Sequence, residues 1–294
     1  MTMFCRATTF AAAAVLAAAA LPAAAFLAAT DRTVYVTVTD GKGAPVPDLA
    51  AADLVVKEGG KEREVTKVVP ASTRMRLTLA VEERLIADTS IRMAIFEFMK
   101  RLADYAEIRM ITIGLRNTTV ADYTSSLDVL VGAINKFTLN PSRDSNVAEG
   151  VLEIANHYAG AKAERPVLVV LAMSGGQAGV EPRTVLDKLR QSGATMYSAT
   201  LAGGVESGPV GSLADQSGRE QVLGDGPKQS GGRRTEVPST GAFPRAMQQI
   251  ADELRSQYAV TYVLPDGVKP DKRFGISTKR KGINLRAPSA IPDK

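Results

Sequence analysis

The segment Met75-Arg-Leu-Thr-Leu-Ala-Val81-Glu-Glu-Arg-Leu-Ile-Ala-Asp-Thr-Ser90 determines the predicted fold. Its apolar run, residues 77–81, has the composition of a strand that is buried on both faces. Directly after the segment, apolar residues recur at the spacing of one helix face: Ile91, Ile95, Phe98 and Leu102. A buried strand that leads into an amphipathic helix is the first unit of an α/β domain, in which ligands bind beyond the carboxyl ends of the strands. Here that position is occupied by Glu82-Glu-Arg-Leu-Ile86.

The rest of the region 74–257 alternates between strand and helix patterns. Residues 107–115, 166–172 and 195–201 are predicted strands, and residues 166–172 form the most apolar of them. Helical apolar spacing separates these runs. Repeated strand–helix units predict a doubly wound, mainly parallel sheet of the von Willebrand factor A or Rossmann-like kind.

The two flanks of this region have β patterns instead. Residues 31–72 contain alternating strands with Gly and Pro turns, and residues 258–287 contain further strands. We expect the C-terminal strands to pair with the N-terminal unit in a small β-sandwich-like module. Residues 203–241 are rich in Gly, Pro, Ser and charge and are predicted to be a long surface tether, with a short helix possible at 212–221.

The N-terminus has the pattern of a secretory signal peptide, residues 1–25, with an alternative small-residue cleavage site at Ala28-Ala29. The predicted location is therefore secreted or periplasmic. Cys5, the one cysteine, lies in this leader, so the mature chain would have no disulfide, zinc thiolate site or cysteine nucleophile. We expect no membrane span after the signal is removed.

The charge pattern argues against nucleic-acid binding. The chain of 294 residues has a formal net charge of +5, and its basic residues are dispersed. The two short basic runs, Gly231-Gly-Arg-Arg234 and Lys279-Arg-Lys281, are interpreted as solvated loop or strand ends.

Three stretches carry a resemblance to a known family. They are Val34-Tyr-Val-Thr-Val-Thr-Asp-Gly-Lys-Gly-Ala-Pro-Val-Pro-Asp-Leu49, Ala52-Asp-Leu-Val-Val-Lys-Glu-Gly-Gly-Lys61 and Gln249-Ile-Ala-Asp-Glu-Leu-Arg-Ser-Gln-Tyr-Ala-Val-Thr-Tyr262. In this order they resemble the bacterial secreted "VWFA-related" proteins, which carry a von Willebrand factor type A domain between β segments. The resemblance implies a protein-binding module with a metal-ion-dependent adhesion site (MIDAS) at the rim of the sheet.

The residues at the implied metal site depart from the family motif. Its Asp-x-Ser-x-Ser positions correspond to Glu82, Arg84 and Ile86, its threonine lies near Ser145, and its later aspartate falls on Ser174. Mg²⁺ requires about six oxygen ligands, and neither an arginine nor an isoleucine supplies one. We therefore predict a degenerate site that binds no metal and no other cofactor.

Three functions remain open at this point. The first is a non-catalytic extracytoplasmic module that binds a protein partner, not identified by the sequence, through rim loops that include Glu82, Arg84, Ser145 and Ser174. The alternative is a cation-dependent adhesin that uses Asp88 and Ser90, although an N-cap role explains both residues. A hydrolase that uses Ser174 and His157 is disfavoured, because Ser174 lacks the glycine two positions before it that a nucleophile elbow requires.

Overall fold

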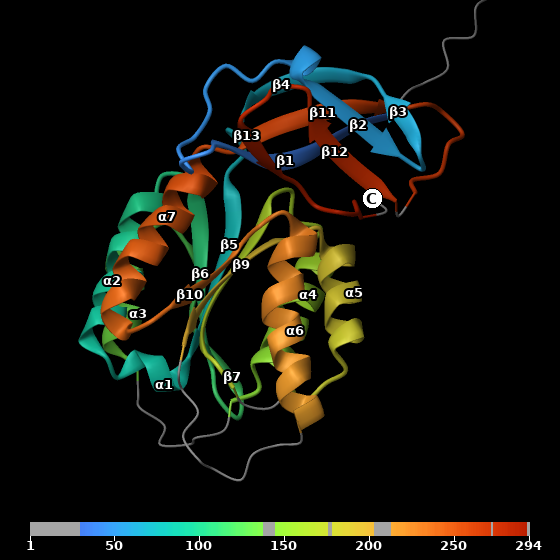
Figure 1. The fold of residues 1–294 in the computed structure, drawn as a ribbon. Coiled ribbons are helices and arrows are strands. Elements are labelled where there is room, and N and C mark those ends of the chain that lie inside the picture. Colours follow the sequence, from blue (N-terminus) through green and yellow to red (C-terminus); the bar gives the residue numbers. More distant parts are fainter. Residues whose placement is uncertain (1–29, 138–144, 176–177, 203–212, 272, 293–294) are drawn as a thin grey trace, which may run out of the picture.

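The computed structural model describes residues 30–137, 145–175, 178–202, 213–271 and 273–292. The predicted signal peptide, residues 1–25, lies outside these ranges. The described chain forms a sheet between two layers of helices, with a separate β-module at one end of the sheet (Figure 1).

The central sheet has the strand order β10-β9-β8-β5-β6-β7. Its parallel strands are β5 (Met75–Glu82), β6 (Ala106–Ile113), β8 (Pro166–Met173), β9 (Thr195–Leu201) and β10 (Arg234–Val237). The edge strand β7 (Asn117–Thr124) is antiparallel to β6. The predicted α/β class with a mainly parallel sheet is confirmed, and β5, the strand on which the prediction rested, lies in the middle of the sheet.

Helices cover both faces of this sheet (Figure 1). One face packs against α2 (Thr89–Leu102), α3 (Leu127–Asn135) and α7 (Phe243–Arg255), and the other packs against α4 (Val147–Ala161), α5 (Pro182–Ser192) and α6 (Leu213–Ser230). The apolar residues of β5 explain why both faces need cover. Leu77, Leu79 and Val81 enter the first core, whereas Ala80 enters the second.

The β-module consists of strands from both ends of the described chain. One sheet has the order β13-β1-β11-β4 and the other has the order β12-β2-β3. Their bounds are β1 (Thr30–Asp40), β2 (Leu54–Glu58), β3 (Lys61–Arg63), β4 (Val65–Pro70), β11 (Tyr258–Leu264), β12 (Phe274–Thr278) and β13 (Ile283–Arg286). Antiparallel pairing of β1 with β11, and of β2 with β12, joins the two ends of the chain around one apolar core.

The prediction of a long tether at 203–241 is corrected for residues 213–241, whereas residues 203–212 lie outside the described ranges. Residues 213–230 form α6, which is longer than the short helix expected at 212–221, and residues 234–237 form β10. Two short 3₁₀ turns are Ala51–Asp53 and Thr240–Ala242. The sequence of α6 is typical of a loop because it contains residues of low helix propensity: Gly218, Gly226 and Pro227. The glycines instead allow close packing, because a Cβ on Gly226 would lie 2.8 Å from Met196 Sδ. Tertiary contacts stabilise a helix that its own residues disfavour.

Within the described ranges, none of the helices combines the length and apolar character that crossing a bilayer requires.

Candidate functional site

The candidate site lies at the carboxyl end of β5, at the end of the sheet away from the β-module (Figure 1). Glu82 is the last residue of β5, and its side chain is fully buried. The short helix α1 (Glu83–Ile86) begins immediately after it. A buried carboxylate at this position is costly unless positive charges or hydrogen-bond donors compensate for the lost water.

Five donors from four parts of the chain satisfy the Glu82 carboxylate. Its Oε1 atom accepts from Arg84 Nη2 at 2.7 Å, from Arg84 Nε at 3.0 Å and from Ser145 Oγ at 2.5 Å. Its Oε2 atom accepts from Arg219 Nη2 and from the Met173 N–H, each at 2.7 Å. Charge-assisted bonds of this length are the strong kind, so the carboxylate is held in one orientation.

Arg219 is the centre of this network and comes from α6. Its side chain is fully buried, and its Nη2 atom also donates to the Met173 carbonyl at 2.7 Å. Its Nη1 atom lies 3.2 Å from Ser145 Oγ, which accepts this bond while its own proton goes to Glu82. One guanidinium therefore ties together β5, the end of β8 and the start of the segment that leads into α4 (Val147–Ala161).

The two arginines decide the ionisation of the carboxylate. Burial alone would raise the pKa of Glu82, but the positive charges of Arg219 and Arg84, with the bonds from Ser145 and Met173, hold that pKa below its usual value. Glu82 is thus a carboxylate in the folded protein. Two guanidinium groups against one carboxylate leave this buried cluster with a net positive charge.

The described residues at the end of β5 do not fit a magnesium ion. The oxygens that would be its ligands, those of Glu82 and Ser145, already accept hydrogen bonds from Arg219 and Arg84. A divalent cation within coordination distance of these oxygens would lie next to two fixed positive charges in a low-dielectric site. Across the described ranges, no group of three or more His, Cys, Asp or Glu side chains is placed to hold a metal ion.

The sequence predicted part of this cluster. Glu82, Arg84 and Ser145 meet in it, and Glu82 forms an ion pair with Arg84. Ser174 follows Met173 at the end of β8, and its backbone N–H donates to the Leu201 carbonyl. Ile86 is buried in the apolar core.

Arg219 lies within 212–221, where the sequence left a short helix open, but it was missed because the surrounding region was predicted to be a surface tether. The sequence did contain one indirect signal, which is that an acidic residue at the end of a buried strand must be matched by a cation. Arg84 is two positions from Glu82, whereas the fully buried partner, Arg219, is 137 positions after Glu82 along the chain.

Asp88 and Ser90, named for a cation-dependent adhesin, and His157, named for a hydrolase, have ordinary structural roles. Asp88 Oδ1 accepts from the Ser90 N–H at 2.7 Å and caps the amino end of α2. His157 stacks on the Tyr123 ring with 5.8 Å between ring centres. Burial lowers the pKa of His157, so its neutral form is favoured.

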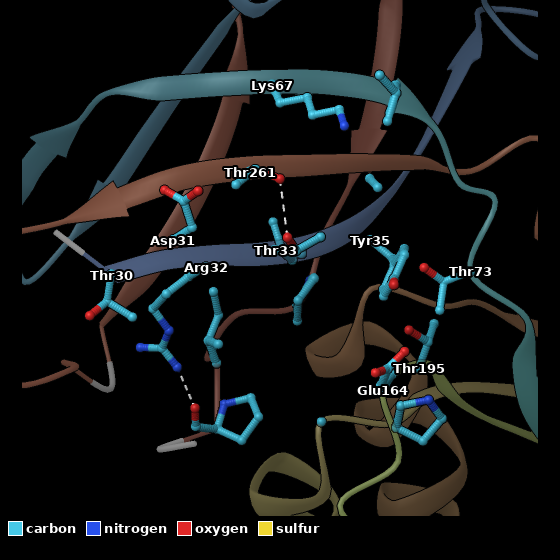
Figure 2. A pocket seen from close by; sticks show the side chains of 18 of the residues that line it. Thr30, Asp31, Arg32, Thr33, Tyr35, Lys67, Thr73, Glu164, Thr195 and Thr261 are labelled. Atoms are coloured by element: carbon cyan, nitrogen blue, oxygen red, sulfur yellow. Dashed lines mark hydrogen bonds between the residues drawn. The ribbon is translucent and has the colours of Figure 1, made fainter.

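A groove lies at the opposite end of the sheet from Glu82, beside the β-module. It has a volume of about 590 Å³ and is lined by hydroxyl groups and by charges of both signs (Figure 2). Thr33 and Thr261 bond to each other across neighbouring strands at 3.1 Å, and Arg32 donates to the Pro292 carbonyl. The charged side chains in its lining are Arg32, Lys67 and Lys162 against Asp31 and Glu164, so cations and carboxylates are mixed there.

Comparisons with known proteins identify the fold. No family model matches the chain, and no curated protein sequence matches it. Proximal thread matrix protein 1 from the mussel byssus, solved with a zinc-occupied MIDAS motif, matches with a TM-score of 0.50, 13% identity and coverage of 68% of this chain and 49% of that one. The fold is of the von Willebrand factor A type. The chain spans about half the length of the mussel protein.

Two further solved structures match with lower scores. The PilB minor pilin from Streptococcus sanguinis has a TM-score of 0.47 and 9% identity, with coverage of 64% of this chain and 63% of that one. An aerotolerance-related membrane protein from Bacteroides fragilis has a TM-score of 0.44 and 12% identity, with coverage of 60% of this chain and 98% of that one. At these identities the matches concern the fold alone.

Proposed function

We propose that this chain is a non-catalytic, extracytoplasmic protein-binding module of the von Willebrand factor A type that works without a metal ion. The observation that carries this proposal is the fully buried pair between Glu82 and Arg219. In a metal-dependent module the ion joins the loops at the rim. Here a guanidinium joins Glu82, Ser145 and the end of β8, so these points are held together before a partner arrives.

The surface around this cluster supports binding by direct contact. Leu115 follows β6 at the same end of the sheet, and 60% of its surface is exposed. Arg116 beside it is also exposed. An exposed leucine next to a cation offers a partner both apolar area and charge, a combination common in protein interfaces.

The extracytoplasmic part of the proposal rests on the predicted signal peptide. A site that needs no divalent cation would function at any concentration of such ions outside the cytoplasm. The partner is expected to be a protein.

The metal independence can be tested with the purified chain. Titration calorimetry with Mg²⁺ and Mn²⁺ should show no saturable heat up to millimolar concentrations, and the melting temperature should be the same with and without chelator. Micromolar binding that is lost in Asp88→Ala would instead support a cation-dependent adhesin.

The binding role needs a second experiment. Proteins that co-purify with the tagged, secreted chain should be retained in chelator and lost from the rim variant Leu115→Ser/Arg116→Ala. Val268→Ser, which removes an exposed apolar side chain of the β-module, is the matched control and should retain them. Partners that depend on the cation, or that bind the rim variant equally well, would refute the proposal.

A further inference from the structure

A second groove, here called the arginine groove, lies between the central domain and the β-module. Its walls come from the end of α6, the start of β10, and strands β12 and β13, and its volume is about 540 Å³. This volume is within the range of about 300–1,000 Å³ that is typical of small-molecule sites. The groove is separate from the Glu82 cluster and independent of the function proposed above.

Four basic side chains line the arginine groove: Lys228, Arg233, Arg234 and Arg286. Among the described residues, no acidic side chain contributes to its walls. The basic run Gly231-Gly-Arg-Arg234, interpreted from sequence as a solvated loop end, therefore has a defined place in the fold. Both of its glycines are buried, and both of its arginines are half-buried.

Arg233 and Arg286 form a fixed pair of cations. Both bind the same carboxylate, that of Glu253 on α7, with Arg233 Nη2 at 3.2 Å from Oε1 and Arg286 Nη2 bound to Oε2. The Glu253 side chain is only 12% exposed, whereas each arginine side chain is 31% exposed. One carboxylate behind two guanidinium groups orients them and leaves a net positive charge at the groove.

The other two cations differ from this pair. Arg234 is held by Glu220 Oε2 at 2.6 Å and Glu236 Oε1 at 3.0 Å, so two carboxylates outweigh its single charge and it offers a ligand no positive charge. Lys228 is exposed in the last turn of α6, and no carboxylate of the described chain forms an ion pair with it. Arg233, Arg286 and Lys228 therefore supply the positive charge that a ligand would meet.

A glycine explains why Arg233 is positioned so firmly. A Cβ on Gly232 would lie 1.8 Å from the Met196 carbonyl oxygen, so no other residue fits against β9 at this point. The Arg233 carbonyl then accepts from the Ser198 N–H at 3.1 Å. The backbone is thus fixed on both sides of the residue, and the entropy lost when Arg233 binds a ligand is reduced.

The remaining wall of the groove is apolar. Ile276 and Leu285 lie in it as half-buried side chains, and Gly275 exposes bare backbone beside them. A ligand that fits must combine a negative group for the arginines with an apolar part for this wall. Arginine pairs bind the planar or tetrahedral oxygens of carboxylate, sulfate and phosphate groups particularly well.

We propose that the arginine groove is a binding site for an oxyanion that is carried on an apolar or aromatic body. The oxyanion binds between Arg233 and Arg286 within reach of Lys228, and the body lies on Ile276 and Leu285. The same chemistry could be presented by a free small molecule or by a modified side chain of a peptide.

Phenyl phosphate is the probe that tests this site, because it joins an aromatic ring to a phosphate. Amide NMR shifts of the full chain should change saturably at Gly224, Gly232 and Gly275, with a dissociation constant in the millimolar range or below. Inorganic phosphate should bind more weakly, and phenol should not shift these amides. A peptide with one phosphotyrosine, compared with free phenyl phosphate, separates the two sources of the ligand.

Three variants make the test decisive. Arg286→Gln should raise the dissociation constant by about tenfold or more, as expected for the loss of charge-assisted hydrogen bonds. Lys228→Gln, which breaks no internal pair and should leave the fold intact, should raise it by a smaller factor. Arg245→Gln, an equal charge change on the exposed face of α7, should leave it within about twofold, because surface charges outside the site are screened.

The proposal is overturned by any of four results. The first is the absence of saturable shifts at the groove amides, and the second is an equal loss of binding in Arg245→Gln. The third is a folded Arg286→Gln protein with unchanged affinity. The fourth is binding of phenol as tight as that of phenyl phosphate, which would show an apolar pocket in place of an oxyanion site.

Discussion

Two fully or nearly buried arginines lie at opposite ends of the central sheet, and they are balanced in different ways. Arg219 binds a carboxylate, that of Glu82, at the carboxyl end of the strands. Arg165, which is 3% exposed, lies just before β8 at the end next to the β-module, where all its bonds are to neutral acceptors.

The bonds of Arg165 join the two parts of the fold. Its Nη1 atom donates to the Thr73 carbonyl at 2.9 Å, and its Nη2 atom donates to the Leu254 carbonyl at 2.8 Å and to Gln257 Oε1 at 2.9 Å. Its guanidinium also lies over the Tyr35 ring of β1. Burial lowers the pKa of Arg165, since no carboxylate compensates for its lost hydration.

The two arginines therefore have different roles: Arg165 joins the β-module to the central sheet, and Arg219 neutralises a buried carboxylate. At Arg165 an uncompensated cation is tolerated because several carbonyls surround it, and it fixes the place where the chain crosses between the module and the sheet. At Arg219 the cation is required, because without it a carboxylate would remain buried beside one partly exposed arginine. The two positions should therefore respond differently to substitution, salt and pH.

The largest effect is expected from Arg219→Met. This change leaves Glu82 buried without its main cation, and breaking a buried pair in this way costs about 3–5 kcal/mol. Chemical denaturation of the two proteins would measure the difference. The double variant Glu82→Gln/Arg219→Met should recover much of the loss, and a single variant within about 1 kcal/mol of the parent would show that the pair is not the organising contact.

Substitution of Arg165 should lower the free energy of unfolding by less than substitution of Arg219. Arg165→Met leaves neutral carbonyls unsatisfied, and we expect a loss of about 2–3 kcal/mol because each such group costs about 1–3 kcal/mol and some can regain water. Cleavage by protease near residues 71–73 or 257 should also become faster. Unchanged cleavage together with unchanged unfolding would contradict a joining role.

The pH dependence of stability distinguishes the two ends further. The pKa of Glu82 is lower in the folded protein than in the unfolded chain, so its contribution is complete above the unfolded value of about 4.3 and is lost as the pH falls toward the folded value. Unfolding measured between pH 6 and 3 should show a shallower acid slope in Glu82→Gln/Arg219→Met than in Arg165→Met. Equal slopes of stability against pH in the two variants would mean that protonation of Glu82 does not contribute to the loss of stability in acid.

The smallest effect on stability is expected from an exposed ion pair. Arg101 on α2 pairs with Asp252 on α7 at 3.2 Å, and both side chains are more than a third exposed. Arg101→Gln should change the free energy of unfolding by less than about 0.5 kcal/mol, because solvent screens such pairs. A loss as large as that in Arg165→Met would mean that burial does not explain the order of these effects.

Local sequence patterns were sufficient for the central strands and most helices. The run from Leu77 to Val81 is mostly apolar, and Ile91, Ile95 and Phe98 follow at helical spacing, so neighbouring residues were enough to predict β5 and α2. The same stretch placed Glu82 and Arg84 at the rim. These two residues are separated by one position, which makes their pairing a local property.

Local patterns left open only a short helix at 212–221, whereas α6 extends from residue 213 to residue 230. Its glycines and Pro227 reduce helix propensity, and its helical form depends on packing against α5 and β9, which lie elsewhere in the chain. For the same reason the position of Arg219, and of the arginine groove at the other end of α6, could not be derived from residue order.

The sequence by itself determined the α/β fold and placed Glu82 and Arg84 at the carboxyl end of β5, because apolar periodicity and the identity of adjacent residues are local properties. Only the tertiary structure decided which cation neutralises Glu82. Arg219 is 137 positions away, and a charge pair at that separation exists only after the sheet and α6 have packed together.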